Sequence, residues 1–330
     1  AFVQAWNATC RGEENNNNTL VIPSGQTFLL QPIKFNGPCK STSIKIQLDG
    51  VIIAPSNIKA WSNPKSHMWI SFSSVFGLIV DGSGKIDGGG SSFWELNLTA
   101  SQRPTALHIN ECNNLTINGI SSINSPKTHL LIKSCNYVAI SKINLLAPET
   151  SPNTDGIDIL NSTNINIFDS TIQTGNVGSL RADGASDAVS GIQVTHCTFN
   201  RTMNGARIKT WEGGQGYARN ISFENITLIN AKNPIMIDQQ YIDKGRPNAK
   251  EDSAVAISNI KYVGFHGTTL NEEAITLKCS VTTSCENVVM DDINITTENG
   301  KTLKVQCENV EGESNGNDLL RDCFKSNNTS

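Results

Sequence analysis

Residues 107–117 read LHINECNNLTI, residues 130–140 read LLIKSCNYVAI and residues 157–167 read IDILNSTNINI. Each stretch is a short alternating strand, a turn rich in Cys, Asn, Ser and Thr, and a second short strand. The same pattern returns later in the chain, at residues 192–199, 221–228, 255–263 and 288–295. Repeats of roughly 20 to 30 residues that each hold several short strands indicate a solenoid.

The strand content of these repeats predicts an all-β fold, a right-handed parallel β-helix whose coils stack about 4.8 Å apart. We expect one such domain over residues 1–330, with a short N-terminal capping helix at Ala1–Cys10. The first strands are expected at residues 20–23, 26–30, 44–48 and 51–53. A β-sandwich would need antiparallel hairpins with tight Asn-Gly or Asp-Gly turns, and the regular repeat argues against it.

The turns between strands repeat small polar residues at equivalent positions, which predicts side chains stacked from coil to coil. Cys112 and Cys135 occupy the same place in consecutive repeats. We therefore interpret both as buried small residues of the core and not as metal ligands.

The charge of the chain is modest. The 330 residues carry a formal net charge of −4 with 17% charged residues and no block of like charges. Such a chain attracts neither nucleic acid nor an anionic membrane surface as a whole, and no apolar run reaches the roughly 18 residues of a membrane span. An anionic ligand would have to be bound by local cations.

The cysteines and the Asn-x-Ser/Thr acceptors both favour a secreted glycoprotein. The nine Cys include two closely spaced pairs suited to short disulfide loops, Cys279 with Cys285 and Cys307 with Cys323, and the odd count leaves at least one free thiol. A few of the acceptor sites are expected to carry glycans. The acceptors are Asn7, Asn17, Asn97, Asn114, Asn161, Asn200, Asn220, Asn225, Asn294, Asn327 and Asn328.

Two polar stretches stand out as candidates for chemistry. Asp155 follows the polar turn 151–154 and directly precedes an alternating strand, and Arg207 and Lys209 lie two residues apart, on one face of another strand. Alone, an Asp before Gly is ordinary turn chemistry, and the two cations are ordinary solvated charges. Side by side on stacked coils, they would suit the cleavage of an acidic polymer.

Several motifs in this order resemble the plant polygalacturonases of glycoside hydrolase family 28, nearly from end to end. The motifs are Val21–Gly25, Asp81–Gly88, Asn153–Asp155, Arg207–Trp211 and Asn233–Tyr241. The resemblance implies a secreted, monomeric enzyme of the plant cell wall (apoplast) that hydrolyses α-1,4-galacturonosyl links of homogalacturonan in pectin with inversion. It implies no cofactor and no metal.

The resemblance also implies roles for single residues. Asp155 matches the catalytic carboxylate that activates water. Asn153, Arg207, Lys209 and Tyr241 match residues that bind pectin or oligogalacturonate. A guanidinium binds a carboxylate through two parallel hydrogen bonds, and Lys209 adds the point charge that a globally acidic protein needs locally.

The chain departs from the family pattern after residue 175. The family has a Gly-Asp-Asp-Cys segment and then Cys-Gly-Pro-Gly-His-Gly, whereas here Gln173–Gly175 runs straight into Asn176–Leu180. We expect about one central coil to be missing, which a solenoid tolerates, and also the family's N-terminal strand. An inverting glycosidase needs two carboxyl groups about 6.5 to 9.5 Å apart; the general acid and one water-activating Asp are absent. Asp183 and Asp187 are weak substitutes in a turn-rich loop.

Three hypotheses therefore stay open. The chain is an active polygalacturonase, a catalytically dead relative that binds pectin or oligogalacturonate, or a shortened product without a role. A pectate lyase is less well supported, because no acidic cluster suited to Ca²⁺ is present in the sequence.

Overall fold

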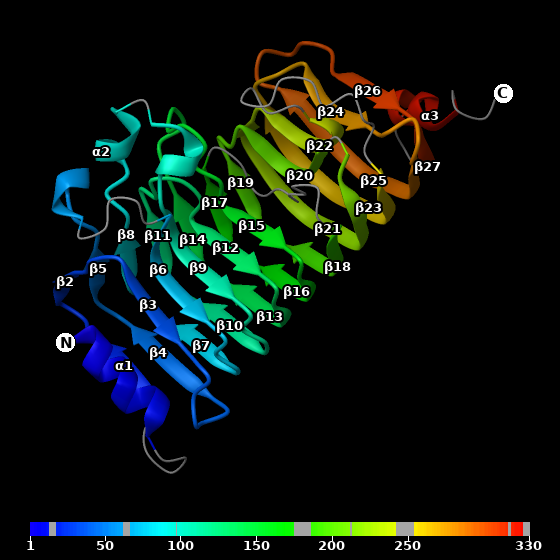
Figure 1. The fold of residues 1–330 in the computed structure, drawn as a ribbon. Helices are drawn as coiled ribbons and strands as arrows, with labels where there is room; N and C mark the ends of the chain where they lie inside the picture. The colour runs from blue at the N-terminus through cyan, green and yellow to red at the C-terminus, as the bar shows by residue number, and fades with distance from the viewer. Residues whose placement is uncertain are drawn as a thin grey trace. The chain divides into compact units, whose positions relative to one another are not determined.

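The computed structural model describes residues 1–12, 18–61, 67–96, 98–174, 186–211, 213–241, 254–315 and 318–325. They divide into two compact units: unit 1 comprises residues 1–158 and 168–175, and unit 2 comprises residues 159–167 and 176–330. Strands dominate both units (Figure 1).

The strands of unit 1 form three parallel columns, and each coil contributes one strand to each column. The first column contains β1 (Thr19–Ile22), β4 (Ile44–Leu48), β7 (Leu78–Asp81), β10 (Leu115–Asn118) and β13 (Asn136–Ser141). The second contains β2 (Thr27–Leu29), β5 (Val51–Ile53), β8 (Lys85–Asp87), β11 (Ser121–Ile123), β14 (Asn144–Leu146) and β17 (Thr171–Gln173). The third contains β3 (Ile33–Asn36), β6 (Met68–Ser73), β9 (Thr105–Asn110), β12 (Leu130–Lys133) and β15 (Ile157–Leu160).

Unit 2 continues the same plan with longer strands, all of them paired in parallel. One group contains β18 (Ser186–Thr195), β19 (Thr198–Asn200), β21 (Gln215–Ala231), β23 (Ala254–Thr269), β25 (Cys285–Thr297) and β27 (Val310–Asn315). A four-stranded sheet contains β20 (Asn204–Trp211), β22 (Asn233–Tyr241), β24 (Glu273–Lys278) and β26 (Lys304–Glu308). Strand β16 (Thr163–Phe168) lies mostly in this unit.

The core is built from apolar side chains stacked in register. Leu20, Ile46, Val80, Ile117 and Ile140 occupy equivalent positions of five consecutive coils, and each is at most 6% exposed. Each inner side chain of this stack lies between those of the two neighbouring coils, and burial of each of the five contributes roughly 1.5 to 3 kcal/mol of free energy. The predicted parallel β-helix is confirmed by this arrangement.

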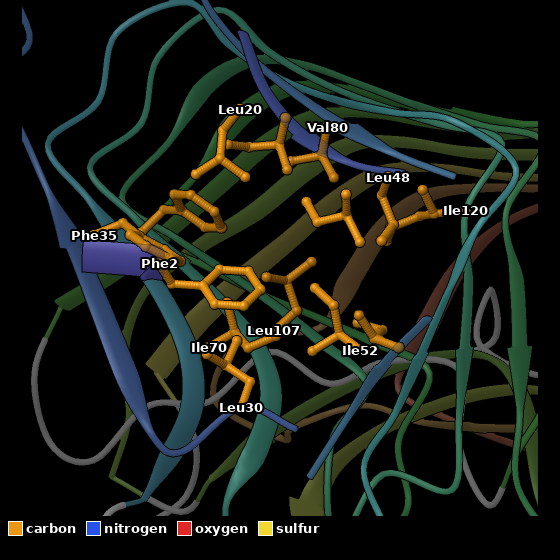
Figure 2. A pocket seen from close by; sticks show the side chains of 14 residues that line it. Phe2, Leu20, Leu30, Phe35, Leu48, Ile52, Ile70, Val80, Leu107 and Ile120 are labelled. Carbon is orange, nitrogen blue, oxygen red and sulfur yellow. The ribbon is translucent and has the colours of Figure 1, made fainter. Parts of the chain in front are cut away.

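The predicted N-terminal helix is α1 (Phe2–Arg11), and it covers the open end of the first coil of unit 1. Trp6 is 4% exposed, and its ring lies 5.1 Å from that of Phe35 and 5.7 Å from that of Phe72. Phe2 lines a small apolar pocket beneath the helix together with core residues of the first coils (Figure 2). A disulfide between Cys10 and Cys39 ties the helix end to the loop after β3.

Among the described residues, four further helical segments are short. They are η1 (Ile58–Ala60), α2 (Ser91–Trp94), η2 (Ala100–Gln102) and α3 (Asp318–Lys325). Helix α3 buries Leu320 and Phe324 and is joined to β26 by the disulfide Cys307–Cys323.

The cysteine predictions hold. Cys279–Cys285 and Cys307–Cys323 are disulfides, whereas Cys112, Cys135 and Cys197 are buried free thiols. The main-chain N–H of Cys112 lies 3.3 Å from Sγ of Cys135, so these two residues stack from coil to coil in the core as predicted.

Candidate active site

Arg103 holds the turn before β15 in place through its hydrogen bonds. This guanidinium donates from Nη2 to Oδ1 of Asn153 at 2.8 Å, and from Nη1 to the carbonyl oxygens of Pro152 and, at 3.2 Å, Pro126. Arg103 is only 2% exposed. Burial lowers the pKa of Arg103, and the negative charge of Asp155 acts in the opposite direction. Arg103 therefore fixes the turn that presents Asp155.

Asn153 was predicted to bind substrate, and in this structure its side-chain oxygen is occupied by Arg103. The residue is exposed and adopts a left-handed φ of 51°, which Asn tolerates better than most residues. The hydroxyls of Ser151 and Thr154 lie 2.6 Å apart, and both residues are buried. The turn is thus closed by its own hydroxyls, and the Nδ2 end of Asn153 is the part left for a ligand.

Asp155 lies two residues before the first residue of β15 and is half-buried. Its carbonyl oxygen accepts a hydrogen bond from the N–H of His129 at 2.8 Å, so its backbone already follows the sheet. Ile157 points into the core, while Asp158 is partly exposed and accepts a hydrogen bond from the Thr128 hydroxyl at 2.8 Å. The segment therefore presents two carboxylates, and a strand follows Asp155 as predicted, with Gly156 between them.

Two buried histidines of unit 1, His108 and His129, were not singled out from the sequence. Nδ1 of His129 lies 2.9 Å from the Ser122 hydroxyl, and burial lowers the His129 pKa to about 3. Nδ1 of His108 lies 3.1 Å from the Ser71 hydroxyl, and burial lowers its pKa to about 4, with smaller contributions from nearby lysines. Both imidazoles are neutral above pH 5, so neither is a cationic proton donor at that pH.

The cation pair lies in unit 2, on the outward face of β20. Arg207 and Lys209 are half-buried, and Ile208 between them is 2% exposed and points into the core. Nη2 of Arg207 lies 3.4 Å from Oδ2 of Asp238, and the two side chains are 11% and 20% exposed. Asp238 is also the register partner of Lys209 on β20. The sequence correctly placed both cations on one face.

Asp238 belongs to a row of alternating charges across the four-stranded sheet. In register order the row contains Lys209, Asp238, Lys278 and Glu308. Alternating signs in neighbouring strands stabilise the row and hold the cations in fixed positions. No role for Asp238 was predicted from the sequence, because its position beside Arg207 appears only once the register between coils is known.

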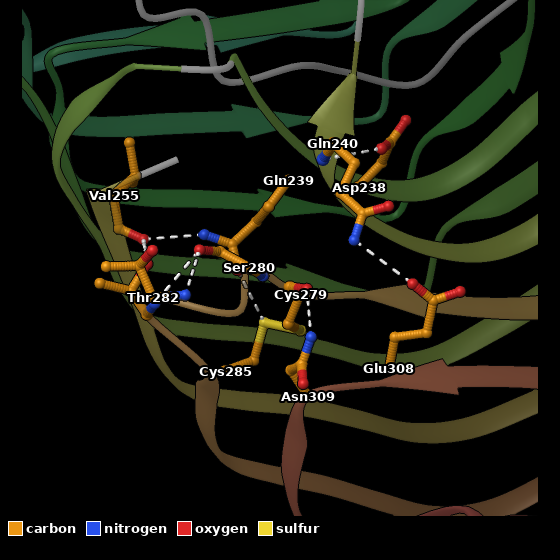
Figure 3. The surroundings of a disulfide bond; sticks show 11 residues. Asp238, Gln239, Gln240, Val255, Cys279, Ser280, Thr282, Cys285, Glu308 and Asn309 are labelled. Atoms are coloured by element: carbon orange, nitrogen blue, oxygen red, sulfur yellow. Dashed lines mark hydrogen bonds between the residues drawn. A yellow bond between two sulfur atoms is a disulfide. The ribbon is translucent and has the colours of Figure 1, made fainter. Parts of the chain in front are cut away.

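The end of β22 is anchored beside the disulfide Cys279–Cys285 (Figure 3). Gln239 is fully buried; its Nε2 donates to the carbonyl oxygen of Val255 at 2.9 Å, and its Oε1 accepts from the N–H of Ser280 at 3.1 Å. Gln240 lies on the other face, and its main-chain N–H donates to Oδ1 of Asp238 at 3.2 Å. The buried amide thus fixes the strand that carries Asp238.

The remaining predicted residues are only partly described. Tyr241 is the last residue of β22 and pairs in register with Trp211, but its side chain lies outside the described part of the structure. Asp183 lies outside the described residues, and for Asp187 only the backbone in β18 is described. The structure thus brings Asp155 and Arg103 together within unit 1, and Arg207, Lys209 and Asp238 within unit 2.

Residues 1–12 and the later described ranges contain no helix long and apolar enough to cross a membrane. In the same part of the chain, His, Cys, Asp and Glu side chains form no group of three or more that would hold a metal ion.

Comparison with known proteins gives one consistent family. The sequence matches glycosyl hydrolases family 28 in two segments, residues 12–177 and residues 176–317. A probable polygalacturonase of Arabidopsis thaliana is 41% identical over 95% of this chain and 74% of its own length. A polygalacturonase of Persea americana is 34% identical over 94% of this chain and 73% of its own. The Arabidopsis alignment spans 345 positions, more than the 330 residues of this chain, so it includes positions that have no counterpart here.

Solved structures share the architecture. The polygalacturonase from Erwinia carotovora ssp. carotovora superposes with a TM-score of 0.70 at 23% identity, covering 94% of this chain and 93% of its own. The endo-xylogalacturonan hydrolase from Aspergillus tubingensis gives 0.68 at 24% identity, covering 92% and 98%. At these identities the likeness concerns the fold, which is the right-handed parallel β-helix. The motifs, the two-segment match and these relatives together show that the chain belongs to glycosyl hydrolase family 28.

Proposed function

We propose that this polygalacturonase-like chain hydrolyses α-1,4-galacturonosyl links of homogalacturonan with inversion, in the plant cell wall. The observation that carries the proposal is the cation pair Arg207 and Lys209, held on one face of β20 beside Asp238. A chain with a net charge of −4 binds a polyanion only where cations are fixed locally.

Each predicted site residue has a physical role in this proposal. The guanidinium of Arg207 binds a galacturonate carboxylate through paired hydrogen bonds, and the ammonium of Lys209 adds a second positive charge. Asp238 keeps Arg207 oriented while the sugar binds. Asn153 and Tyr241 bind sugar hydroxyls. Asp155 removes a proton from the attacking water, a task for an ionised carboxylate.

The segment of the family pattern that is missing after residue 175 decides how fast the hydrolysis runs. We propose that the two-segment family match and the long alignments reflect about one missing coil in an otherwise single β-helix domain. The Asp pair and the His of the family pattern are absent from the sequence. Loss of a general acid typically slows a reaction by about 10² to 10⁴, so we expect slow hydrolysis.

The same absence favours a second candidate function, binding of oligogalacturonate without hydrolysis. This candidate keeps the cation pair and removes the need for a general acid. It differs from the first in one observable, the release of new reducing ends.

The family and the disulfides support the proposed extracellular location. Three disulfides are present among the described residues, and disulfides persist in oxidising compartments. This supports an extracellular protein, proposed to act as a monomer on pectin without a cofactor.

A titration tests the binding part of the proposal. Purified protein is titrated with short oligogalacturonate and, as a control, with a neutral oligosaccharide of equal length. We expect binding only to the acidic ligand, and loss of that binding in the double variant Arg207→Ala, Lys209→Ala. Equal affinity of the double variant and the unmodified chain would show that the cation pair does not bind substrate. Inversion is tested by the anomeric form of the first product, which should be β from an α-linked substrate.

A further inference from the structure

One corner of the coils in unit 2 carries a ladder of asparagine side chains. Asn220 on β21, Asn259 on β23 and Asn287 on β25 occupy equivalent positions of three consecutive coils, since the residues that follow them, Ile221, Ile260 and Val288, are register partners. The three residues adopt left-handed φ values of 55°, 55° and 52°. All three are exposed to solvent.

The side-chain amides of the ladder are hydrogen-bonded in one direction along the three coils. Nδ2 of Asn287 donates to Oδ1 of Asn259 at 2.7 Å, and Nδ2 of Asn259 donates to Oδ1 of Asn220 at 3.0 Å. Asn220 is therefore the last acceptor of the ladder. Its own Nδ2 is the one amide nitrogen of the three that donates to no other asparagine of the ladder, whose inner rungs are Asn259 and Asn287.

The ladder stops at Asn220 because the equivalent residue of the preceding coil is Gly191. The residues on either side of Gly191 pair with those on either side of Asn220, and Gly191 has no side chain to accept a hydrogen bond. Glycine suits this position, because its φ is 66° and a Cβ would approach Oδ1 of Asn164 to 3.0 Å. The glycine therefore ends the ladder of side-chain amides at Asn220.

The acceptor sequence for N-glycosylation coincides with this open end. Asn220 is followed by Ile221 and Ser222, whereas the inner rungs Asn259 and Asn287 are followed by residues that give no acceptor. Coils stack about 4.8 Å apart, so a sugar on Nδ2 of Asn259 or Asn287 would crowd the neighbouring amide to which that nitrogen donates. At Asn220 a sugar on Nδ2 leaves Oδ1 free to keep accepting from Asn259.

We propose that Asn220 carries an N-linked oligosaccharide at the open end of this ladder, and that the inner rungs cannot carry one. In the reaction, Nδ2 of Asn220 bonds to C1 of the first N-acetylglucosamine of a lipid-diphosphate-linked oligosaccharide. The bond from C1 to the diphosphate oxygen breaks, the lipid diphosphate leaves, and the amide nitrogen gives up one proton. The proposal concerns passage through a secretory pathway and does not depend on hydrolysis of pectin.

Peptide mapping tests the site. The full chain is secreted from plant cells behind a host leader sequence, in a Thr227→Ala background that removes the neighbouring acceptor at Asn225. The tryptic peptide that begins at Asn220 is expected to carry a glycan, and peptide N-glycosidase, applied to the denatured chain before trypsin, should convert Asn220 to Asp. Adding Ser222→Ala should abolish the glycan while keeping the Asn220 amide in the ladder. An unmodified Asn220 in the secreted Thr227→Ala protein overturns the proposal.

An engineered acceptor tests the inner rungs. Lys261 is exposed, and Lys261→Thr creates an acceptor at Asn259, while Lys261→Ala removes the same charge without creating one. We expect the secreted Lys261→Thr protein to be unmodified at Asn259 or to be secreted several-fold less than Lys261→Ala. Normal secretion of protein glycosylated at Asn259, with unchanged melting temperature, would contradict the ladder argument.

Discussion

Replacing Arg207 with Ala removes the guanidinium that lies 3.4 Å from Asp238 and leaves Lys209 as the neighbouring cation on β20. The Arg207 side chain is 11% exposed, so its bond to a bound carboxylate is largely shielded from water. A hydrogen bond to a charged group contributes about 1.5 to 3 kcal/mol. The dissociation constant for oligogalacturonate should therefore rise by about 10- to 150-fold.

The assay is calorimetric titration in an Asp155→Asn background, so that the ligand is not consumed. Arg207→Lys keeps the positive charge but loses the planar guanidinium that makes two parallel hydrogen bonds. Its affinity for oligogalacturonate should therefore lie between those of the proteins with Arg and with Ala at this position. Lys261→Ala is the matched control, because it removes one exposed positive charge from another sheet of unit 2. If Arg207→Ala binds as tightly as Lys261→Ala, Arg207 is not a ligand-binding residue.

Three further predictions concern stability. Ile117→Ala should lower the free energy of unfolding by about 2 to 5 kcal/mol, because the side chain is 1% exposed between two stacked neighbours; a change below about 1 kcal/mol in urea unfolding would contradict the stacked core. Cys10→Ser should cost about 3 to 4 kcal/mol through loss of a disulfide with a sequence separation of 29, and unchanged thermal stability would argue that α1 does not depend on this bond. Lowering the pH should also destabilise the fold: His129 has a folded-state pKa of about 3, below the unfolded value of about 6.5, so its contribution is complete above pH 6.5 and is lost as the pH falls toward 3. Unfolding free energies that are equal at pH 7 and pH 4 would refute this.

The repeat in the sequence was sufficient to predict the architecture, because a stacked coil imposes the same apolar alternation on every turn. Residues 107–117 and 130–140 fall on paired strands, with Leu115 opposite Val138 and Ile117 opposite Ile140. The sequence did not predict that β21 runs unbroken from Gln215 to Ala231. The bends at Asn220 and Asn225 are single left-handed residues, and the pairing with β23 resumes in the same register after each of them.

The site was predicted only where local sequence carries the information. Arg207 and Lys209 were found because alternation along one strand places both on one face. Arg103 and Asp238 were missed, because their contacts join residues 50 and 31 positions apart in the chain. Which residues of neighbouring coils come into contact depends on the length of each loop between strands. A single sequence does not reveal those loop lengths.

Hydrolysis itself is tested most directly by the release of reducing sugar from de-esterified polygalacturonate, with the purified chain set beside its Asp155→Asn variant. We predict slow release by the unmodified chain and none above background by the variant, with both proteins keeping the same β-type circular dichroism spectrum. Equal release by the two proteins would contradict the role of Asp155. No release by either, with oligogalacturonate still bound, would contradict hydrolysis and favour a binding protein built on the family 28 fold.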